Sequence, residues 1–343
     1  MKKSLIALAV LAASGAAMAQ SSVTVYGRLD ASVGSGKVGN ITNGVGPASN
    51  TQLFNSSLTS SRLGFRGTED LGGGLKAIFA IETSVGVDSP VASSLGDRAA
   101  FVGLSGGFGT IKLGRHDTSF DDIRDLMVSS NLWDSTNFAS TETIVGTTGF
   151  AGVGNLADYG DRASNQIRYE SPTFGGFSAG VSYAFDEVAA PTKQDRTAFN
   201  LRYKAGNLDV GYGYQENKDN TALASNIEYN TLAAAYNFGA FRVSGGWNQA
   251  KNKGATPTKA DTYTVGVNVP VDALDFSVGY STSKAKRPAG TFEKGDAFSA
   301  GVTYSLSKRT RLYALLTNGD IENAAGVKTR QRDIYAVGVA HTF

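Results

Sequence analysis

Apolar and polar residues alternate along most of this chain, and a period of two residues predicts β-strands. The alternation is clearest at 333–343, where one face carries Tyr335, Val337, Val339, His341 and Phe343. The same pattern recurs in sixteen segments after residue 20, at 23–33, 60–68, 74–83, 97–105, 110–116, 164–171, 177–185, 197–205, 207–215, 228–238, 241–249, 261–269, 274–283, 297–305, 310–318 and 333–343. We therefore predict an all-β protein with an even number of strands.

The connections between these segments alternate between short and long. Short ones, such as 105–109 and 238–240, are interleaved with long polar ones, such as 34–59 and 319–332. Tight turns on one side and long loops on the other are typical of an up-and-down antiparallel structure.

Strand length and aromatic strand ends favour a membrane barrel over a soluble sheet. A strand of about 9–11 residues crosses a bilayer when it is tilted by about 45°, and aromatic residues at its ends form interfacial girdles. Because no backbone group can stay unpaired in lipid, the strands must close into a ring. We predict a transmembrane antiparallel β-barrel of 16 strands around a water-filled lumen. The alternatives are a soluble β-sandwich, a repeat protein and a Gly-rich adhesin.

The alternation stops between residues 117 and 162, and so long an insertion is usually functional. Its acidic residues outnumber its two bases, Arg124 and Arg162. We predict that Asp121, Asp122 and Asp125 form the acidic side of a pore constriction. A helical turn would anchor this segment to the barrel wall through Phe120, Ile123, Leu126 and Met127. The alternative is an external acidic loop.

The inward face of the predicted strands is rich in basic residues, above all in the early strands. The pore basic cluster that we predict consists of Arg28, Arg62, Arg66, Lys76, Arg98 and Arg168. An acidic loop folded against this wall would set a transverse electric field across a wet neck. Arg98 shares its face with Val102 and Leu104, and strict alternation directs Arg115 toward lipid. Alternatively, the arginines pair structurally with Asp30, Glu82 and Glu170.

The start of the chain predicts export. Lys2 and Lys3 precede an apolar run at 5–13, and small residues end in an A-x-A pattern at 17–19. These features are typical of a secretory signal peptide, so we predict a signal peptide at 1–19 and an outer-membrane barrel domain at 20–343.

Composition excludes several other classes of function. Removal of residues 1–19 leaves 30 basic and 30 acidic residues, so no global positive field exists to attract nucleic acid. The chain has no cysteine, which excludes disulfides and thiolate chemistry. The two histidines, His116 and His341, are not part of a nucleophile elbow. We therefore predict no catalytic residues, no metal site and no cofactor.

With these residues in view, the chain resembles the general diffusion porins of Gram-negative bacteria, most closely the neisserial and Bordetella-like group of the β-proteobacteria. The resemblance runs from Ser22 to Phe343. Its most specific parts are SSVTVYGRLDASV (21–33), SRLGFRGTEDLGGGLKAIFAIE (61–82), RAAFVGLSGGFGTIKLGR (98–115) and YAVGVAHTF (335–343). The PEFG-type turn of enteric porins is absent from the long insertion.

The resemblance implies a homotrimeric barrel whose third external loop, about 117–162, folds inward as an eyelet. The loop acids then take the acidic role, and Arg28, Arg62, Arg66, Arg98 and Arg168 take the basic role by strand position. The terminal Phe343 resembles the family's signal for the outer-membrane assembly machinery.

These observations predict passive diffusion of small hydrophilic solutes and inorganic ions across the Gram-negative outer membrane. The basic lumen predicts a modest preference for anions. Two alternatives remain, a substrate-specific outer-membrane channel and an outer-membrane barrel enzyme. The predicted partners are two further copies of the chain, outer-membrane lipids and the assembly machinery.

Overall fold

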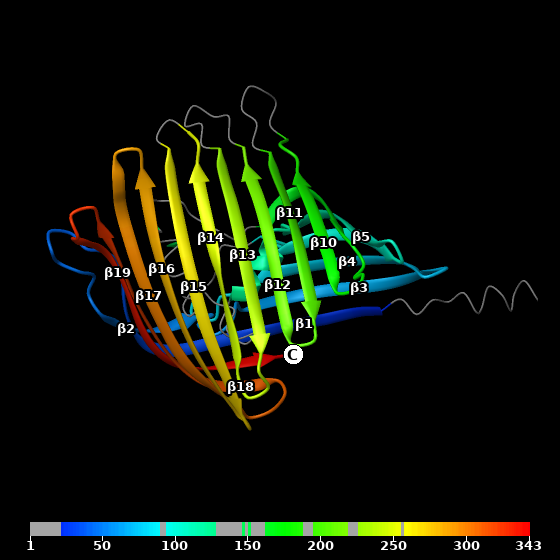
Figure 1. The fold of residues 1–343 in the computed structure, drawn as a ribbon. Helices are drawn as coiled ribbons and strands as arrows, with labels where there is room; N and C mark the ends of the chain where they lie inside the picture. The colour runs from blue at the N-terminus through cyan, green and yellow to red at the C-terminus, as the bar shows by residue number, and fades with distance from the viewer. Residues whose placement is uncertain are drawn as a thin grey trace, which may run out of the picture.

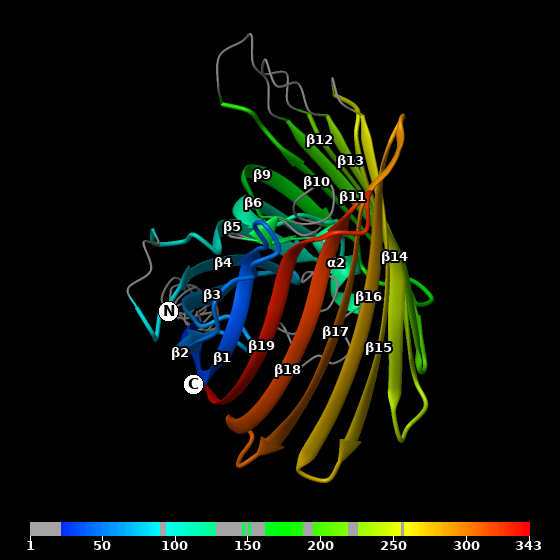
Figure 2. The same ribbon diagram turned by 90° about the vertical axis from the view of Figure 1, so that its left-hand side faces the viewer.

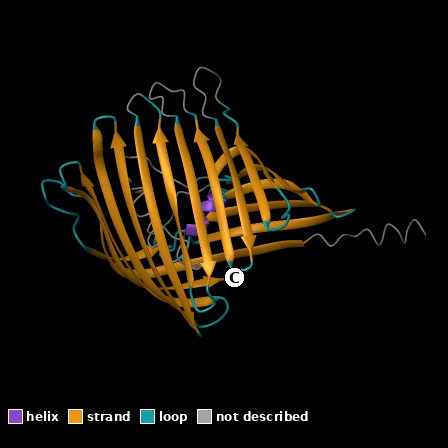
Figure 3. Cartoon of the chain, viewed as in Figure 1, coloured by secondary structure: helices purple, strands orange, loops and turns teal. Residues whose placement is uncertain are grey.

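A computed structural model of the chain describes residues 22–89, 94–127, 146–147, 150–151, 162–187, 195–218, 226–254 and 257–343. Most of them lie in strands (Figures 1 and 3). The strands are β1 (Ser22–Asn40), β2 (Asn50–Asn55), β3 (Arg62–Gly72), β4 (Leu75–Ser84), β5 (Ala99–Gly106), β6 (Gly109–Asp117), β7 (Gly146–Thr147), β8 (Phe150–Ala151), β9 (Arg162–Glu170), β10 (Phe177–Ala184), β11 (Arg196–Ala205), β12 (Leu208–Asn217), β13 (Ile227–Asn237), β14 (Arg242–Asn252), β15 (Thr258–Val271), β16 (Leu274–Arg287), β17 (Gly290–Ser305), β18 (Thr310–Asn323) and β19 (Lys328–Thr342).

Helical structure in these ranges is limited to two short pieces that follow β6. They are α2 (Asp121–Arg124) and the 3-10 helix η1 (Asp125–Met127). Within the described ranges, no helix has both the length and the apolar character needed to span a membrane.

The strands form one antiparallel sheet that closes on itself, apart from the short hairpin of β7 and β8. β1 pairs with β19 on one side and with β2 and β3 on the other. β2 pairs with residues 31–36 of β1, and β3 pairs with residues 22–28, so β2 and β3 share one place in the ring. The ring therefore has 16 strand positions, which confirms the predicted fold.

The two faces of the sheet separate apolar from polar side chains. Large apolar residues such as Val25, Val102 and Val265 are exposed on the outer face. Inner positions of the same strands carry polar residues, and several of them, including Ser281 and Thr317, are buried. An exposed apolar surface of this extent needs a cover, and the hydrocarbon of a bilayer provides it.

Several strands are longer than the sequence pattern predicted. β1 continues to Asn40, and β2 lies inside the stretch 34–59 that we predicted as a loop. β18 and β19 likewise extend through most of the predicted loop 319–332. Beyond the bilayer both faces of a strand meet water, so the ladder continues without the apolar alternation that marks a spanning segment.

The C-terminus joins the ring at its short-turn end. The Phe343 amide donates to the Gly27 carbonyl at 3.0 Å, and the Gly27 amide donates back to the Phe343 carbonyl at 3.2 Å. The Phe343 ring lies directly over Gly27, since a Cβ at that position would stand 2.5 Å from the ring. A glycine is therefore required opposite the terminal ring.

Between β2 and β3 the chain bends into the barrel and is held there by Asp30. The Asp30 carboxylate accepts hydrogen bonds from the Leu58 amide at 2.7 Å and from the Thr59 amide at 2.6 Å. It also accepts one from the Tyr313 hydroxyl. Leu58 is buried in an apolar cluster with Tyr313 and Ile334 from the inner faces of β18 and β19. This segment thus lines the inside of the barrel.

Candidate pore constriction

After β6 the chain turns inward, and α2 and η1 lie within the ring of strands (Figures 2 and 3). Their apolar side chains face the wall formed by β12, β13 and β14. Each of these side chains is at most 5% exposed: Phe120, Ile123, Leu126 and Met127. This packing confirms the predicted apolar anchor and places the described part of the insertion inside the lumen, not outside the barrel.

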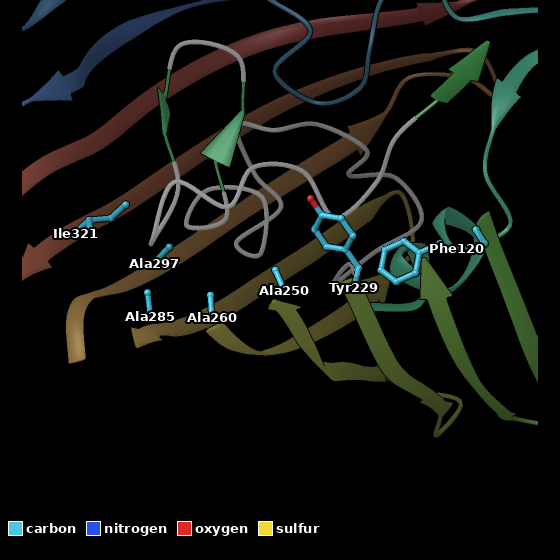
Figure 4. Close-up of a cluster of buried hydrophobic side chains, with 8 residues drawn as sticks. Phe120, Tyr229, Ala250, Ala260, Ala285, Ala297 and Ile321 are labelled. Carbon is cyan, nitrogen blue, oxygen red and sulfur yellow. The ribbon is translucent and has the colours of Figure 1, made fainter. Parts of the chain in front are cut away.

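Small residues in the wall make room for this anchor. A Cβ added at Gly211 would lie 2.5 Å from the Ile123 side chain, and one at Gly246 would lie 2.7 Å from the Met127 sulfur. Phe120 packs against Tyr229 with ring centroids 6.1 Å apart. Figure 4 shows these two rings at one end of a row of inward-facing residues that includes Ala250, Ala260, Ala285 and Ala297.

Polar groups of the wall hold the loop backbone. The Asn200 amide donates to the Ser119 carbonyl at 2.5 Å and to the Asp122 carboxylate at 2.9 Å. The Ser119 amide donates to the Ser182 hydroxyl at 3.1 Å, and the Thr118 hydroxyl donates to the Gln215 side chain at 2.7 Å. Asn200, Ser182 and Gln215 were not among the residues predicted to hold the loop. Strand alternation places them inward, but only the fold shows which loop atoms they meet.

Arg168 joins the wall to the start of the inserted loop. Its Nη1 donates to the carbonyls of Asp117 at 2.8 Å and Thr118 at 3.1 Å. Its Nη2 lies 2.5 Å from an Asp122 oxygen and 3.0 Å from a Glu170 oxygen. Its side chain is only 7% exposed, and one guanidinium thus contacts two carbonyls and two carboxylates. Arg168 therefore holds the loop as well as lining the lumen.

A second group of charges surrounds Glu82 on β4. Arg62 lies 3.1 Å from its carboxylate, Arg98 lies 2.7 Å away, and the Tyr26 hydroxyl donates to it at 3.0 Å. Arg66 stacks over the Tyr26 ring at 4.9 Å from the centroid. The alternative, structural pairing of the arginines with carboxylates, therefore holds for Arg62 and Arg98 with Glu82 and for Arg168 with Glu170. Arg66 has no ion pair within the described chain.

Arg28 and Lys76 lie at the margins of the predicted basic cluster. Arg28 stands opposite Arg62 in the register of β1 and β3, on the inward-facing parity of the strand. Lys76 is exposed beside the β3–β4 turn, where it pairs in register with Asp70, and it borders neither of the lumen hollows described below. Its position differs from the prediction because it lies at the rim, beyond the neck.

Local breaks in the apolar–polar alternation explain the side-chain directions of Arg98 and Arg115. Arg98 precedes the first residue of β5, so its side chain turns inward to Glu82 although Val102 and Leu104 face outward. Arg115 lies at a register shift between Gly114 and His116. Its Nε donates to the Asp97 carbonyl at 2.6 Å, and its Nη1 donates to the Ser164 hydroxyl at 3.0 Å. Arg115 is therefore held at the strand end, past a bulge.

The three predicted loop acids occupy different environments. Asp122 borders both lumen hollows and pairs with Arg168. Asp125 is the most exposed, at 63% of its side chain, and borders one hollow. Asp121 is buried against Arg124 at 3.1 Å and borders neither hollow, so its predicted pore-facing role does not match its position. The remaining acids of the insertion, from Asp134 to Asp161, lie outside the described residues.

Two hollows meet at Asp122, Arg168 and Glu170, one on each side of the loop anchor. The hollow next to β3 and β4 contains six basic side chains, Arg62, Arg66, Arg98, Lys112, Arg162 and Arg168. It contains four acidic ones, Glu82, Asp117, Asp122 and Glu170. The second hollow has four charges of each sign, with Arg202, Lys204 and Arg242 opposite Asp209 and Asp125. The lumen lining is thus polar, charged and more basic than acidic.

Burial raises the pKa of Asp121 well above its usual range, against the opposing effect of Arg124. The docked loop therefore favours the neutral carboxyl, whereas a loop detached from the wall would expose Asp121 to water and restore an ordinary pKa. Docking of the loop is most favourable below the ordinary pKa of a carboxyl group. As the pH rises from there toward the raised pKa of Asp121, the docking equilibrium constant falls by at most about tenfold per pH unit.

We expect current fluctuations through the protein to increase as the pH rises across this window. An Asp121→Asn variant keeps a neutral side chain at every pH, so its fluctuations should lose this dependence. Single-channel recordings from acidic to alkaline pH measure the fluctuations of the wild type and of the variant. Asp125→Asn, at an exposed neighbouring carboxylate, is the matched control, and an unchanged pH profile in Asp121→Asn would refute the assignment.

Known proteins are similar to this chain in sequence over most of its length. The family described as Gram-negative porin matches residues 5–324. Outer membrane porin protein 32 of Delftia acidovorans is 38% identical over 99% of this chain and 95% of its own length. The major outer membrane protein P.IB of Neisseria meningitidis serogroup B is 30% identical over the whole of both chains.

Solved structures show the same likeness. The anion-selective porin from Comamonas acidovorans superposes with a TM-score of 0.79 at 30% identity, over 94% of this chain and 100% of its own. The trimer form of OmpT from Vibrio cholerae has a TM-score of 0.70 over 94% of this chain and 99% of its own. At 16% identity, that second likeness concerns the fold alone.

Proposed function

This chain belongs to the Gram-negative porin family, and we propose that its charged neck gives the channel a mild preference for anions. The protein is a passive diffusion channel of the outer membrane, a closed barrel through which small hydrophilic solutes pass. Asp122 and Asp125 of the inserted loop border a lumen whose lining is more basic than acidic. A field of this kind acts on every solute that passes through a wet constriction.

The observation that carries the anion preference is the excess of basic side chains around the hollow beside β3 and β4. Arg62, Arg98 and Arg168 are offset by carboxylates within hydrogen-bonding distance. Arg66 is exposed to the lumen, stacks on Tyr26 and has no such partner among the described residues. Its charge is therefore the least compensated, and the similar anion-selective porin agrees with this direction.

Reversal potentials in a planar bilayer under a KCl gradient test this proposal. We expect an anion-leaning potential for the wild-type protein. In Arg66→Gln, the anion-to-cation permeability ratio should fall roughly two- to fivefold, as expected for one charge partly screened by water and salt. Arg66→Lys keeps the charge and is the matched control. A cation-leaning wild type would contradict the proposal, and a saturable current would favour a substrate-specific channel instead.

We further propose that the channel is a homotrimer without catalytic activity, with a signal peptide at 1–19 and a barrel domain at 20–343. Trimeric assembly predicts conductance steps in triplets. The position of Phe343 over Gly27 at the end of the last strand supports its proposed role as an assembly signal. Residues 1–21 lie outside the described ones, so N-terminal sequencing of the mature protein tests the cleavage site.

A further inference from the structure

The second of the two lumen hollows lies toward the short-turn end of the barrel, and we call it the short-turn hollow. Its lining includes Thr173, Asn207 and Asn237, which lie in or beside the turns that follow β9, β11 and β13. Its volume of about 760 Å³ is within the range of ~300–1,000 Å³ that is typical of small-molecule sites. Because the short turns of an outer-membrane barrel face the periplasm, a solute that has passed the inserted loop meets this hollow next.

Several charged side chains of the short-turn hollow are paired with one another. Arg202 contacts the Asp209 carboxylate twice, at 2.7 and 2.5 Å. Arg168 lies 2.5 Å from an Asp122 oxygen and 3.0 Å from a Glu170 oxygen. Because each of these charges is opposed at hydrogen-bonding distance, the pairs attract a passing solute only weakly.

Two further charges of opposite sign lie where the inserted loop meets the wall. Asp125 of the loop borders the hollow and is 63% exposed, with Arg124 at 3.2 Å. Arg242 on β14 borders the same hollow, and its Nη2 donates to the Leu126 carbonyl at 3.3 Å. Leu126 directly follows Asp125, and consecutive Cα atoms are about 3.8 Å apart. The Arg242 guanidinium and the Asp125 carboxylate therefore lie within the reach of one small molecule.

The uncharged part of the lining suits a peptide group. Side chains that both donate and accept hydrogen bonds border the hollow, namely Ser171, Thr173, Ser178, Asn200, Asn207 and Asn237. Lys204, whose side chain is 67% exposed, adds a cation beside the turn after β11. A lining of this kind favours small polar solutes over apolar ones.

We propose that the short-turn hollow binds zwitterions of amino-acid or dipeptide size. The planar Arg242 guanidinium receives the solute carboxylate through two parallel hydrogen bonds, and the Asp125 carboxylate receives the solute ammonium group. An extended dipeptide spans at most about 7 Å, which fits two protein charges that come from neighbouring positions at the loop and the wall. This inference rests on the diffusion channel proposed for the chain and names a class of solute that the channel retains.

The same two charges discriminate against solutes with a single charge. An anion that binds Arg242 without an ammonium group leaves its own charge near the Asp125 carboxylate. A cation that binds Asp125 without a carboxylate lies near the Arg242 guanidinium. Because like charges repel, the site selects the zwitterion over both.

The test uses dialanine as the zwitterion, N-acetyl-dialanine as the anion and dialanine amide as the cation. Each is added to either side of single channels of the full-length protein in a planar bilayer, and the fall in KCl conductance with concentration gives an apparent affinity. We expect dialanine to bind roughly two- to fivefold more tightly than the anion, which lacks the contact with the exposed Asp125. It should bind roughly tenfold more tightly than the cation, which lacks the contact with Arg242.

Two substitutions separate the two contacts. Asp125→Asn should abolish the preference for dialanine over N-acetyl-dialanine, a result that a loss of loop packing alone does not produce. Arg242→Gln should weaken dialanine binding roughly tenfold. Arg242→Lys keeps the charge without the planar fork, so it should retain more affinity than Arg242→Gln.

The matched controls make the same two substitutions in exposed short turns outside both hollows, as Asp272→Asn and Arg309→Gln. Both should bind dialanine as the wild type does. Equal wild-type affinity for dialanine and N-acetyl-dialanine, equal losses in the control variants, or no concentration-dependent fall in a conducting channel would each overturn the proposal. The reversal potential is measured in the same membranes. A cation-leaning channel that still prefers dialanine would refute the proposed anion preference and support this site.

Discussion

Replacing Arg168 with alanine will loosen the inserted loop and raise the single-channel conductance. Arg168 contacts the carbonyls of Asp117 and Thr118 and the carboxylates of Asp122 and Glu170, and its removal leaves these carboxylates close together without the cation between them. Hydrogen bonds to charged groups contribute about 1.5–3 kcal/mol each when buried. Because Asp122 is partly exposed, we expect a net loss of about 2–4 kcal/mol in loop docking, a roughly 30- to 1000-fold shift in that equilibrium.

Planar-bilayer recordings of Arg168→Ala should therefore show a higher mean conductance with larger fluctuations than the wild type. Arg168→Lys keeps the charge but cannot reach all four acceptors, so an intermediate result is expected. Arg202→Ala is the matched control, since Arg202 pairs with Asp209 on the wall and donates no hydrogen bond to the loop among the described residues. If the two alanine variants behave alike, Arg168 acts only as a pore charge and not as an anchor.

Replacing Asp30 with alanine will destabilise the barrel more than other polar substitutions in its inner wall. The carboxylate is fully buried and accepts hydrogen bonds from the Leu58 and Thr59 amides and from the Tyr313 hydroxyl. Alanine would leave these donors buried without an acceptor, at about 1–3 kcal/mol for each. The segment between β2 and β3 would also lose its hold on the wall, and Leu58 with it.

We expect Asp30→Ala to lower the free energy of unfolding by about 3–9 kcal/mol, summed over these three donors. Urea unfolding of the detergent-refolded protein, followed by tryptophan fluorescence and by heat-modifiable migration on gels, measures the loss. Ser32→Ala is the control because it removes a hydroxyl that hydrogen-bonds Ser57 and Tyr313 but leaves the Asp30 carboxylate in place, at about 1 kcal/mol for each bond. A double-mutant cycle with Tyr313→Phe isolates the bond between the two side chains. Similar losses for Asp30→Ala and Ser32→Ala would contradict this account.

The architecture was predictable because every spanning strand of the barrel meets the same physical constraint. Each spanning strand must present an apolar face to lipid and a polar face to water, and every backbone group must pair, so alternation and strand length alone predict a closed ring of 16 positions. The same parity predicted that Arg62, Arg66 and Arg168 face the lumen, where the structure places them. The apolar spacing within 120–127 similarly predicted that this segment packs on a wall.

Strand alternation does not predict side-chain direction where the hydrogen-bond ladder between strands is interrupted. Arg98 lies just outside β5 and Arg115 lies at a bulge, so the alternation of the neighbouring strands did not predict their directions. The split of one barrel position between β2 and β3 was also hidden, because β2 is only six residues long and shows no sustained apolar alternation. The close contacts of Gly211 and Gly246 were hidden as well, because only the fold brings Ile123 and Met127 against them.

The sequence by itself determined that this chain is an outer-membrane barrel with a charged lumen and an inserted acidic loop. Those properties follow from patterns along the chain: the two-residue alternation, the length of the strands, the aromatic residues at strand ends and the local charge. Only the tertiary structure decided that Asp122 faces the neck while Asp121 is buried, and that Arg168 anchors the loop. These are contacts between residues far apart in the chain, set by strand register and loop path, and neither leaves a periodic mark in the sequence.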